Sequence, residues 1–455
     1  MADLRYMGPT GRNLLNASDA ATRIAAGEIT SEALVADCLA RIRARDPDIG
    51  AWAYVDPEYA IEQARLLDRT PRLGPLHGIP VGVKDVLDTR DMPTGYGSVI
   101  YKGNRPSGDS ACVAALRRAG AVILGKTTTT EFASPWAVGV RNPHDLTRTP
   151  GVSSSGSAAA VADFMVPLAL GTQTGGSIIR PATYCGIYGF KATIDGFDRG
   201  GIRHVRPSLD TLGLFARSIP DIALLRRAIT GEAHGMAQWP DGNRPHLGLC
   251  RTSQWSLASP ETQQAIGIAK ERLCDAGAEV IEIALPQVFE RALDSFRVIS
   301  LWEGASALER EMREHLDAMD PWLRDVARKL PSVTREHYEA AKSHAAECRV
   351  QLASVFAGVN ALITPAAAGE ASRTLNGLED QSFCQLWTMM HGPCLTIPAF
   401  TGPNRMPMGL QIVGPVGGDE RLVGLAAWIA GAMAPLPISA MPGAEALAAR
   451  QPGAQ

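Results

Sequence analysis

The order of helical and strand-like segments constrains the fold of this chain most strongly. In DSACVAALRRAGAVILGKT a helical pattern ends at Gly120, and an apolar strand pattern follows directly. The same order returns in SPETQQAIGIAKERLCDAGAEVIEIALP, where we expect Ser259 to cap a helix that begins at Pro260. Helices that alternate with apolar strands predict an α/β fold, in which a mixed and mostly buried sheet is covered by helices on both faces.

Four segments divide the expected fold. Residues 17–70 are predicted to form N-terminal helices, residues 71–235 a catalytic core, and residues 286–356 a charged helical cover. Residues 357–430 return to strand patterns, in ALITPAA, LTIPAF and MGLQIVG, so this part of the chain rejoins the sheet. Length alone suggests about three domains. No linker-like stretch interrupts the sequence, however, and we predict a single domain over residues 1–455.

Composition excludes several classes of function. A formal net charge of -3 gives no electrostatic reason to bind nucleic acid or acidic membranes. No apolar stretch approaches the roughly 20 residues that span a bilayer, and the first residues lack a secretory pattern, so we expect a cytoplasmic location. The eight cysteines contain no CxxC pair and the nine histidines are dispersed, so the sequence requires no metal and no cofactor. The expected partner is a small molecule.

One nucleotide-binding motif is a false match. Residues 120–127, GAVILGKT, fit the P-loop pattern GxxxxGK[ST] letter for letter. The residues between the two glycines form an apolar strand pattern, whereas a P-loop needs a loop whose N–H groups surround phosphate. The TTTTEF that follows is rich in β-branched residues and begins no clear helix. We therefore do not expect nucleotide binding.

The run PGVSSSGSAAA, residues 150–160, carries four serine hydroxyls but no acid, cysteine or histidine. A serine is a poor nucleophile at neutral pH unless a base removes its proton. No GxSxG elbow surrounds these serines, and no Ser–Asp–His order can be assigned. Lysine is the other available base if burial lowers its pKa. Lys84, in GIPVGVKDV, is the one lysine within an apolar, glycine-punctuated segment, although a salt bridge with Asp85 or another acid is the alternative.

A second glycine-rich stretch, LGTQTGGSIIRP, places two glycines directly before Ser177. Glycines let the backbone approach a ligand closely and turn consecutive N–H groups toward one point, which is how an oxyanion hole is built. Taken alone, the stretch is far better explained by a tight turn that leads into a helix.

Together, GIPVGVKD, PGVSSSGSAAAVA and LALGTQTGGSIIRPATYCGIYGFKAT resemble the amidase signature family, and in particular its malonamidase-like and amidase–urethanase-type members. Similar text in AGAVILGKTTTTEFA, PSLDTLGLFARSIPDIALL, ALITPAA and MGLQIVGP extends the resemblance over most of residues 20–430. The resemblance implies a Ser–Ser–Lys triad, with Ser177 as nucleophile, Ser153 as a bridging serine after a cis peptide bond, and Lys84 as base. It also implies a supporting hydroxyl, Ser154, and an oxyanion hole formed by the N–H groups of Thr174, Gly175, Gly176 and Ser177.

The activity implied by the resemblance is hydrolysis of amides, including aryl amides, and of carbamates, through an acyl-enzyme and without a cofactor. Loops placed by analogy suggest Tyr96, Trp136 and Trp387 as substrate-binding residues, although these aromatic side chains can equally belong to the core. Arg180 is a further candidate, because in malonamidase-like members an arginine at this place holds a substrate carboxylate. A malonamate-type half-amide hydrolase is therefore one alternative, and a structural ion pair is the other role for Arg180.

A further alternative is a glutaminase that resembles the transamidation subunits of the family, which work with additional subunits on glutaminyl-tRNA. For this chain the expected partner stays a small-molecule amide or carbamate, with no nucleic acid and no membrane, and a homodimer is left open.

Three residues depart from the family's common pattern. Val152 replaces the usual glycine before the bridging serine, which places a β-branched side chain beside Ser153. Gln173 stands where the family usually has aspartate and, together with Arg180, it indicates a rearranged network around the nucleophile. Thr128 replaces the common asparagine, and the sequence suggests no consequence for this change.

Overall fold

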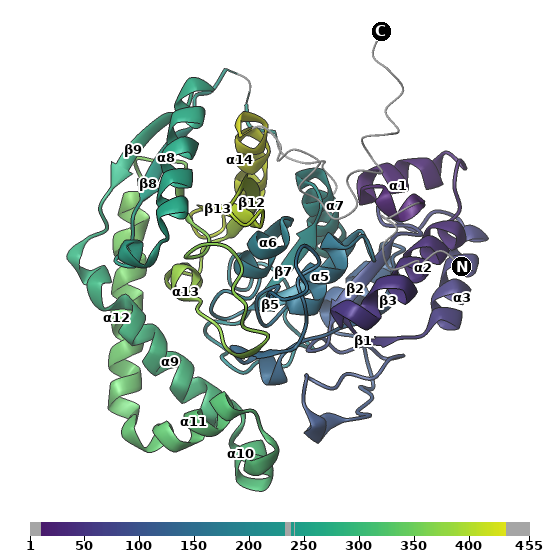
Figure 1. Ribbon diagram of the computed structural model, residues 1–455, viewed down its shortest axis with the longest axis horizontal. Helices are drawn as coiled ribbons and strands as arrows, with labels where there is room; N and C mark the ends of the chain where they lie inside the picture. Colours follow the sequence, from purple (N-terminus) through teal and green to yellow (C-terminus); the bar gives the residue numbers. More distant parts are fainter. Residues whose placement is uncertain (1–10, 233–237, 241, 434–455) are drawn as a thin grey trace.

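A mixed sheet of 11 strands forms the centre of the protein (Figure 1). The computed structural model describes residues 11–232, 238–240 and 242–433, so both ends of the predicted domain 1–455 lie outside the described residues. The strand order is β1-β3-β2-β5-β7-β6-β12-β13-β10-β8-β9. The strands are β1 (Trp52–Val55), β2 (Pro80–Lys84), β3 (Val122–Thr127), β5 (Leu168–Gln173), β6 (Tyr188–Lys191), β7 (Thr211–Ala216), β8 (His246–Cys250), β9 (Glu279–Ile283), β10 (Ala361–Pro365), β12 (Cys394–Thr401) and β13 (Pro407–Val413).

Strand direction divides this sheet into three regions. The neighbours β3, β2 and β5 run parallel, and so do β10, β8 and β9 at the other end. From β5 through β7, β6, β12 and β13 to β10, each pair is antiparallel. Because β2 and β5 are parallel neighbours, with Val83 opposite Leu170, their carboxyl ends meet at one edge of the sheet. A separate two-stranded sheet joins β4 (Trp136–Val138) to β11 (Asn376–Leu378).

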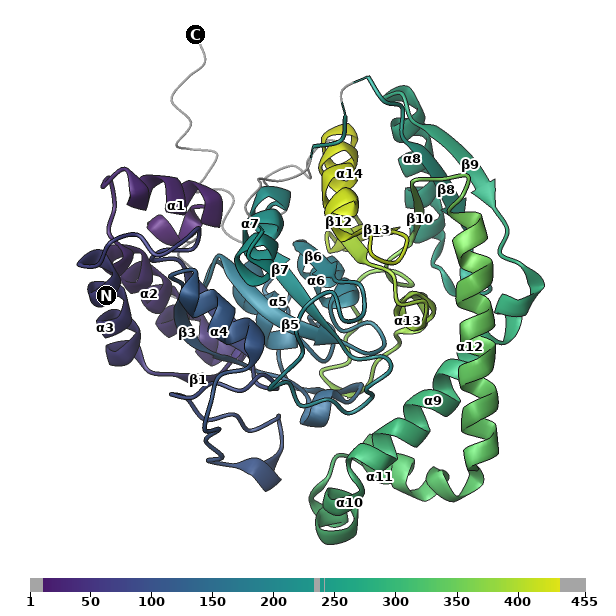
Figure 2. The same cartoon turned by 180° about the vertical axis from the view of Figure 1, so that it is seen from behind.

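Helices cover both faces of the sheet, which confirms the predicted α/β architecture. Figure 1 shows α5 and α6 in front of the central strands, and Figure 2 brings α4 and α7 forward from behind. The α-helices are α1 (Ala17–Ala25), α2 (Ser31–Ile49), α3 (Pro57–Asp68), α4 (Ala111–Arg118), α5 (Ser155–Ala162), α6 (Ile179–Cys185), α7 (Ile219–Thr230), α8 (Pro260–Asp275), α9 (Ala292–Ala307), α10 (Glu309–His315), α11 (Pro321–Lys329), α12 (Arg335–Val355), α13 (Ser382–Met389) and α14 (Asp419–Ala432).

The predicted helical cover, residues 286–356, contains α9 to α12 and lies beside the sheet (Figure 2). A small apolar cluster joins it to the central part of the protein, made by Phe132, Val205, Leu308, Met319 and Leu323. Polar contacts surround this cluster: the Ser134 hydroxyl donates to Asp320 at 2.6 Å, and the Tyr101 hydroxyl donates to Glu311 at 2.6 Å. The cover is therefore attached to the loops that precede β4 and, through Val205, to the segment between β6 and β7.

Local signals in the sequence located several elements. Ser259 caps α8 by accepting from the Thr262 N–H, and Pro260 is the first helical residue, as predicted. The P-loop-like residues 122–127 form the buried strand β3, so the false match is confirmed as core. The prediction of helices alone over residues 17–70 was wrong at β1, because the short aromatic and β-branched run WAYV pairs with the edge of β3.

One hydrophobic core extends through the described chain. Its main cluster includes residues from Ala17 in α1 to Met433 after α14, and it draws side chains from both ends of the sheet. The C-terminal strands β12 and β13 lie in the middle of the sheet, so the described residues form a single domain. Among the described residues, no helix combines the length and the apolar character that crossing a membrane needs.

Candidate active site

Lys84 ends β2, a strand in which all five residues are buried. Its Nζ lies 2.7 Å from the Ser153 Oγ, 2.8 Å from the Thr172 Oγ1 and 3.4 Å from the Thr172 carbonyl oxygen. Burial lowers the pKa of this amine from 10.5 to about 7, and the charge of Asp210 partly opposes the change. A substantial fraction of Lys84 is therefore neutral near pH 7 and able to accept a proton.

The three residues expected to form a triad lie together. Ser153 precedes α5, and the peptide bond between Val152 and Ser153 is cis. The Ser153 N–H donates to the Ser177 Oγ at 2.8 Å, while the Ser153 Oγ contacts Lys84. Within the part of the chain that the structure describes, no hydrogen bond joins the two serine hydroxyls directly. Ser177 is 5% exposed and Ser153 is fully buried, so of the two Ser177 is the one that reaches solvent.

Hydroxyls behind the lysine form a further layer of contacts. Ser154, the predicted supporting residue, donates through its Oγ to the Thr172 carbonyl at 3.1 Å and accepts from the Thr172 N–H at 3.3 Å. Sequence reasoning missed Thr172 as a partner of Lys84, and it missed Asp210, whose carboxylate accepts from the Thr174 hydroxyl. Their contacts depend on strand pairing, and the residue types alone carry no signal for them.

The loop from Thr174 to Ser177 connects β5 to α6 and has unpaired backbone donors. Its four N–H groups donate to no acceptor among the described residues, whereas the N–H groups of Ile178 and Ile179 that follow donate to the Gln173 side chain. Buried N–H groups are nearly always paired in folded proteins. Four consecutive backbone donors beside Ser177 are therefore available to a ligand.

Arg180 lies on α6 with 1% of its surface exposed. Its Nη2 donates to the Val152 carbonyl oxygen at 2.9 Å, directly before the cis bond. Its Nε and Nη1 have no hydrogen-bond partner among the described residues, and no carboxylate there lies within ion-pair distance. The alternative of a structural ion pair for Arg180 is therefore wrong within the described residues.

The three aromatic candidates have different surroundings. Tyr96 donates through its hydroxyl to Asp88 at 2.9 Å and packs against Tyr101. Trp136 is half-buried on β4 and donates through its Nε1 to Asn376 at 3.0 Å. Trp387 is fully buried in the main core and its Nε1 has no hydrogen-bond partner among the described residues, so its role in substrate binding stays a prediction. The apolar face of α13 turns this side chain inward.

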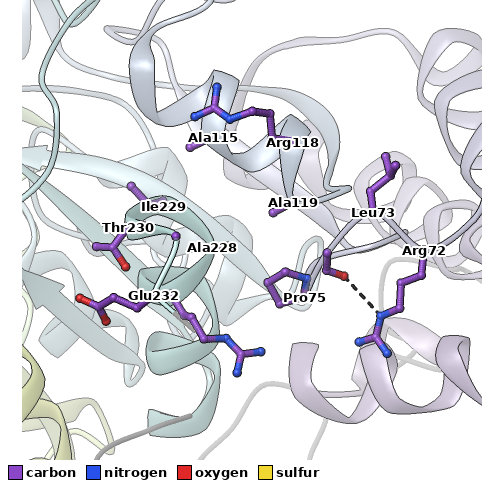
Figure 3. Close-up of a pocket in the computed structure, with 13 residues that line it drawn as sticks. Arg72, Leu73, Pro75, Ala115, Arg118, Ala119, Ala228, Ile229, Thr230 and Glu232 are labelled. Atoms are coloured by element: carbon purple, nitrogen blue, oxygen red, sulfur yellow. Dashed lines mark hydrogen bonds between the residues drawn. The ribbon is translucent and has the colours of Figure 1, made fainter. Parts of the chain in front are cut away.

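A surface pocket elsewhere contains none of these residues (Figure 3). It lies between the loop from Arg72 to Pro75, the end of α4 and the end of α7, and the Arg72 side chain donates to the Gly74 carbonyl there. No nucleophile with a nearby base lines this pocket. The candidate site is therefore the cluster around Lys84, Ser153 and Ser177.

Comparison with known proteins agrees with this geometry. Residues 33–423 match the family described as Amidase. The chain belongs to the amidase family. It is 35% identical over 464 residues to a glutamyl-tRNA(Gln) amidotransferase subunit of Acidothermus cellulolyticus, an alignment that covers 89% of this chain and 92% of that protein.

Two other similar proteins cover nearly the whole chain. The 2-amino-5-chloromuconic acid deaminase of Comamonas testosteroni is 31% identical over 446 residues, an alignment that covers 90% of this chain and 95% of that protein. The structure of the peptide amidase of Stenotrophomonas maltophilia superposes with a TM-score of 0.81 at 29% identity, covering 93% of this chain and 98% of that one. As a member of the amidase family, this enzyme hydrolyses carbon–nitrogen bonds.

Proposed function

We propose that this amidase-family protein hydrolyses amides, including aryl amides, and carbamates through an acyl-enzyme on Ser177. One observation carries the proposal. A fully buried lysine whose pKa is lowered to about 7 lies 2.7 Å from the hydroxyl of Ser153, and the N–H of that same serine contacts the Ser177 Oγ. A base with a pKa near the working pH is the kind of group that activates a serine.

In the proposed reaction, the Ser177 Oγ attacks the carbonyl carbon of the substrate. Its proton passes to the Ser153 hydroxyl, and the proton of Ser153 passes to neutral Lys84. The free N–H groups of the loop from Thr174 to Ser177 stabilise the oxyanion. Return of a proton to the departing amine leaves the acyl-enzyme, on which water repeats the cycle. The Ser153 N–H supports this order, since it occupies a lone pair of the Ser177 Oγ and leaves the hydroxyl proton free to be donated.

A second candidate function concerns the acyl side of the substrate. The Nη1 of buried Arg180 is unpaired, which favours a half-amide whose carboxylate would accept a hydrogen bond from it. The relative from Comamonas testosteroni is named for an acid substrate, which agrees with this candidate. The similarity to the glutamyl-tRNA(Gln) amidotransferase protein favours a glutaminase instead, and that function expects additional subunits. The cytoplasmic location and the homodimer stay predictions.

Covalent labelling tests the proposed chemistry. Incubation with a fluorophosphonate followed by intact-mass analysis is expected to show one adduct on wild type, and none on Ser177→Ala. Lys84→Met is expected to lose nearly all turnover above neutral pH. Ser155→Ala is a matched control, since this buried hydroxyl of the same serine run has no hydrogen-bond partner among the described residues. If Lys84→Met turned over substrate at the wild-type rate, Lys84 would not be the base, and the proposal would be wrong.

A substrate panel separates the candidate functions. Purified protein is offered anilides, aliphatic amides, carbamates, dicarboxylic half-amides and glutamine. A preference for half-amides that Arg180→Ala removes would establish the half-amide reading, whereas equal rates for Arg180→Ala and wild type would reject it. Turnover of glutamine alone, with anilides untouched, would favour the glutaminase.

A further inference from the structure

The carbonyl of Gly175, in the loop before Ser177, accepts a hydrogen bond from Thr388, and the Thr388 hydroxyl in turn accepts one from Gln173. The proposed reaction uses neither of these buried side chains. We infer that Gln173 and Thr388 are positioning residues, and that their hydrogen bonds orient the Gly175–Gly176 peptide so that its N–H faces the developing oxyanion. The inference rests on the proposed function, because the orientation matters only if this loop stabilises a reaction intermediate.

The orientation of the Gln173 carboxamide is fixed by its neighbours. Its Oε1 accepts from the Ile178 N–H at 2.8 Å and from the Ile179 N–H at 3.0 Å. Backbone N–H groups can only donate, so the oxygen must lie on this side and the NH₂ on the other. The Nε2 then donates to the Thr388 Oγ1 at 3.0 Å. Gln173 is fully buried, so no water competes for these bonds.

The hydroxyl of Thr388 connects the fixed Gln173 side chain to the loop before Ser177. It accepts from Gln173, so its single hydrogen is free to be donated. Two carbonyl oxygens lie within reach, that of Gly175 at 3.2 Å and that of Cys384 at 3.3 Å in the preceding turn of α13. The bond to Cys384 stays within the helix, whereas the bond to Gly175 ties α13 to the loop.

Because the peptide group is planar, the hydrogen bond to the Gly175 carbonyl also fixes the direction of the Gly176 N–H. In a trans peptide the C=O of Gly175 and the N–H of Gly176 point in opposite directions. The carbonyl is held from the side of α13, so the Gly176 N–H points away from α13. The helix also packs tightly behind the loop. A Cβ on Gly176 would lie 3.1 Å from the Cys384 Cβ, and one on Gly175 would lie 2.0 Å from the Gln381 Oε1.

A carboxamide at position 173 is essential to this arrangement. A carboxylate of the same length can accept from Ile178 and Ile179, but it has no hydrogen to give to Thr388. The threonine hydroxyl would then donate to the carboxylate, and the Gly175 carbonyl would lose its donor. Gln173 thus determines which way the Thr388 hydroxyl points, and this residue type differs from the aspartate that the family's pattern usually has there.

Three single variants and one double variant test the inference, each compared with wild type for amide hydrolysis and for the rate of fluorophosphonate labelling. Thr388→Val is expected to lower kcat about tenfold to hundredfold with KM changed less than about twofold, since one oxyanion donor is worth up to about 10³ in kcat and this residue acts on such a donor indirectly. Labelling slows in parallel, because the phosphonyl oxygen occupies the same place. Thr388→Ser keeps the hydroxyl and restores most of the rate. Gln173→Glu lowers kcat as Thr388→Val does, and the double variant is no slower than the slower single variant.

A matched control separates the proposed role of the Thr388 hydroxyl from the general effect of replacing a buried threonine by valine. Thr364 in β10 is a buried threonine whose hydroxyl has no partner among the described residues, so Thr364→Val is expected to keep wild-type kcat and labelling. Wild-type kcat in Thr388→Val would overturn the inference, and so would a loss that Thr388→Ser fails to restore. Absence of a Ser177 adduct on wild type would instead remove the proposed function itself, and the inference with it.

Discussion

Burial of Lys84 makes the stability of the protein depend on pH, and the substitution Lys84→Met can measure this dependence. The pKa of its amine is lowered from 10.5 to about 7 because folding removes it from water. Between these values the unfolded chain holds a proton that the folded chain has released, so stability rises with pH. The penalty is fully present below pH 7 and disappears above pH 10.5. At about 1.4 kcal/mol for each pKa unit, the contribution changes by about 2 kcal/mol between pH 7 and pH 9.

Lys84→Met removes the titrating group and keeps an apolar stem of similar length. The variant loses the hydrogen bonds to Ser153 and Thr172, but this loss is common to both pH values and cancels in the comparison. Urea unfolding at pH 7 and at pH 9 gives the free energy of unfolding of each protein. From pH 7 to pH 9, we expect wild type to gain about 2 kcal/mol relative to Lys84→Met.

An exposed lysine provides the control for this experiment. Lys102 lies at the surface, so Lys102→Met is expected to differ from wild type by the same amount at both pH values. If the difference between Lys84→Met and wild type also stayed constant, the amine would be solvated in the folded protein. That result would refute the argument from burial and remove the reason for treating Lys84 as a base.

Three further outcomes are expected. The kcat/KM for an amide rises with pH and levels off above about pH 7, because Lys84 must be neutral, and a flat profile from pH 5 to pH 9 would contradict this. Asp163→Ala removes the carboxylate that lies 2.9 Å from the buried guanidinium of Arg41 and costs about 3 to 5 kcal/mol, measured by urea unfolding. Gly156→Ala is expected to lower the melting temperature strongly, since its Cβ would lie 2.3 Å from a backbone oxygen, whereas Gly267→Ala, with open space in α8, gains up to about 1 kcal/mol. Equal melting temperatures for these two glycine variants would contradict the packing argument.

Much of the fold could be predicted because its signals are local. The helix that Ser259 caps and the strand after Gly120 each follow from a few adjacent residues, and the structure has both. The strand β1 was missed because four residues carry too little pattern and its pairing with β3 is made across a long stretch of chain. The position of β12 and β13 in the middle of the sheet also depends on pairings that no short segment encodes.

The candidate site divides in the same way. Lys84, Ser153 and Ser177 could be found because their motifs are long and resemble a known family, and the structure brings them within hydrogen-bond distance. Thr172 and Thr388 could not, because their roles come from the pairing of β5 with β2 and from the packing of α13 on a loop more than two hundred residues earlier. The surroundings of Trp387 could not be predicted for a related reason. The sequence does not say whether an aromatic side chain of α13 faces the core or the surface, and the structure buries this one in the main core.

The order of the strands has a consequence for how the protein is made. The strand β6 pairs with β12, with Lys191 opposite Cys394, so its partner is synthesised about two hundred residues later. At 5 to 20 residues per second, the growing chain leaves this strand edge open for roughly 10 to 40 s. An open edge recruits other strands, including those of neighbouring nascent chains. We therefore expect the yield of native enzyme to depend on translation speed during this interval, and chains that stop before β12 to aggregate.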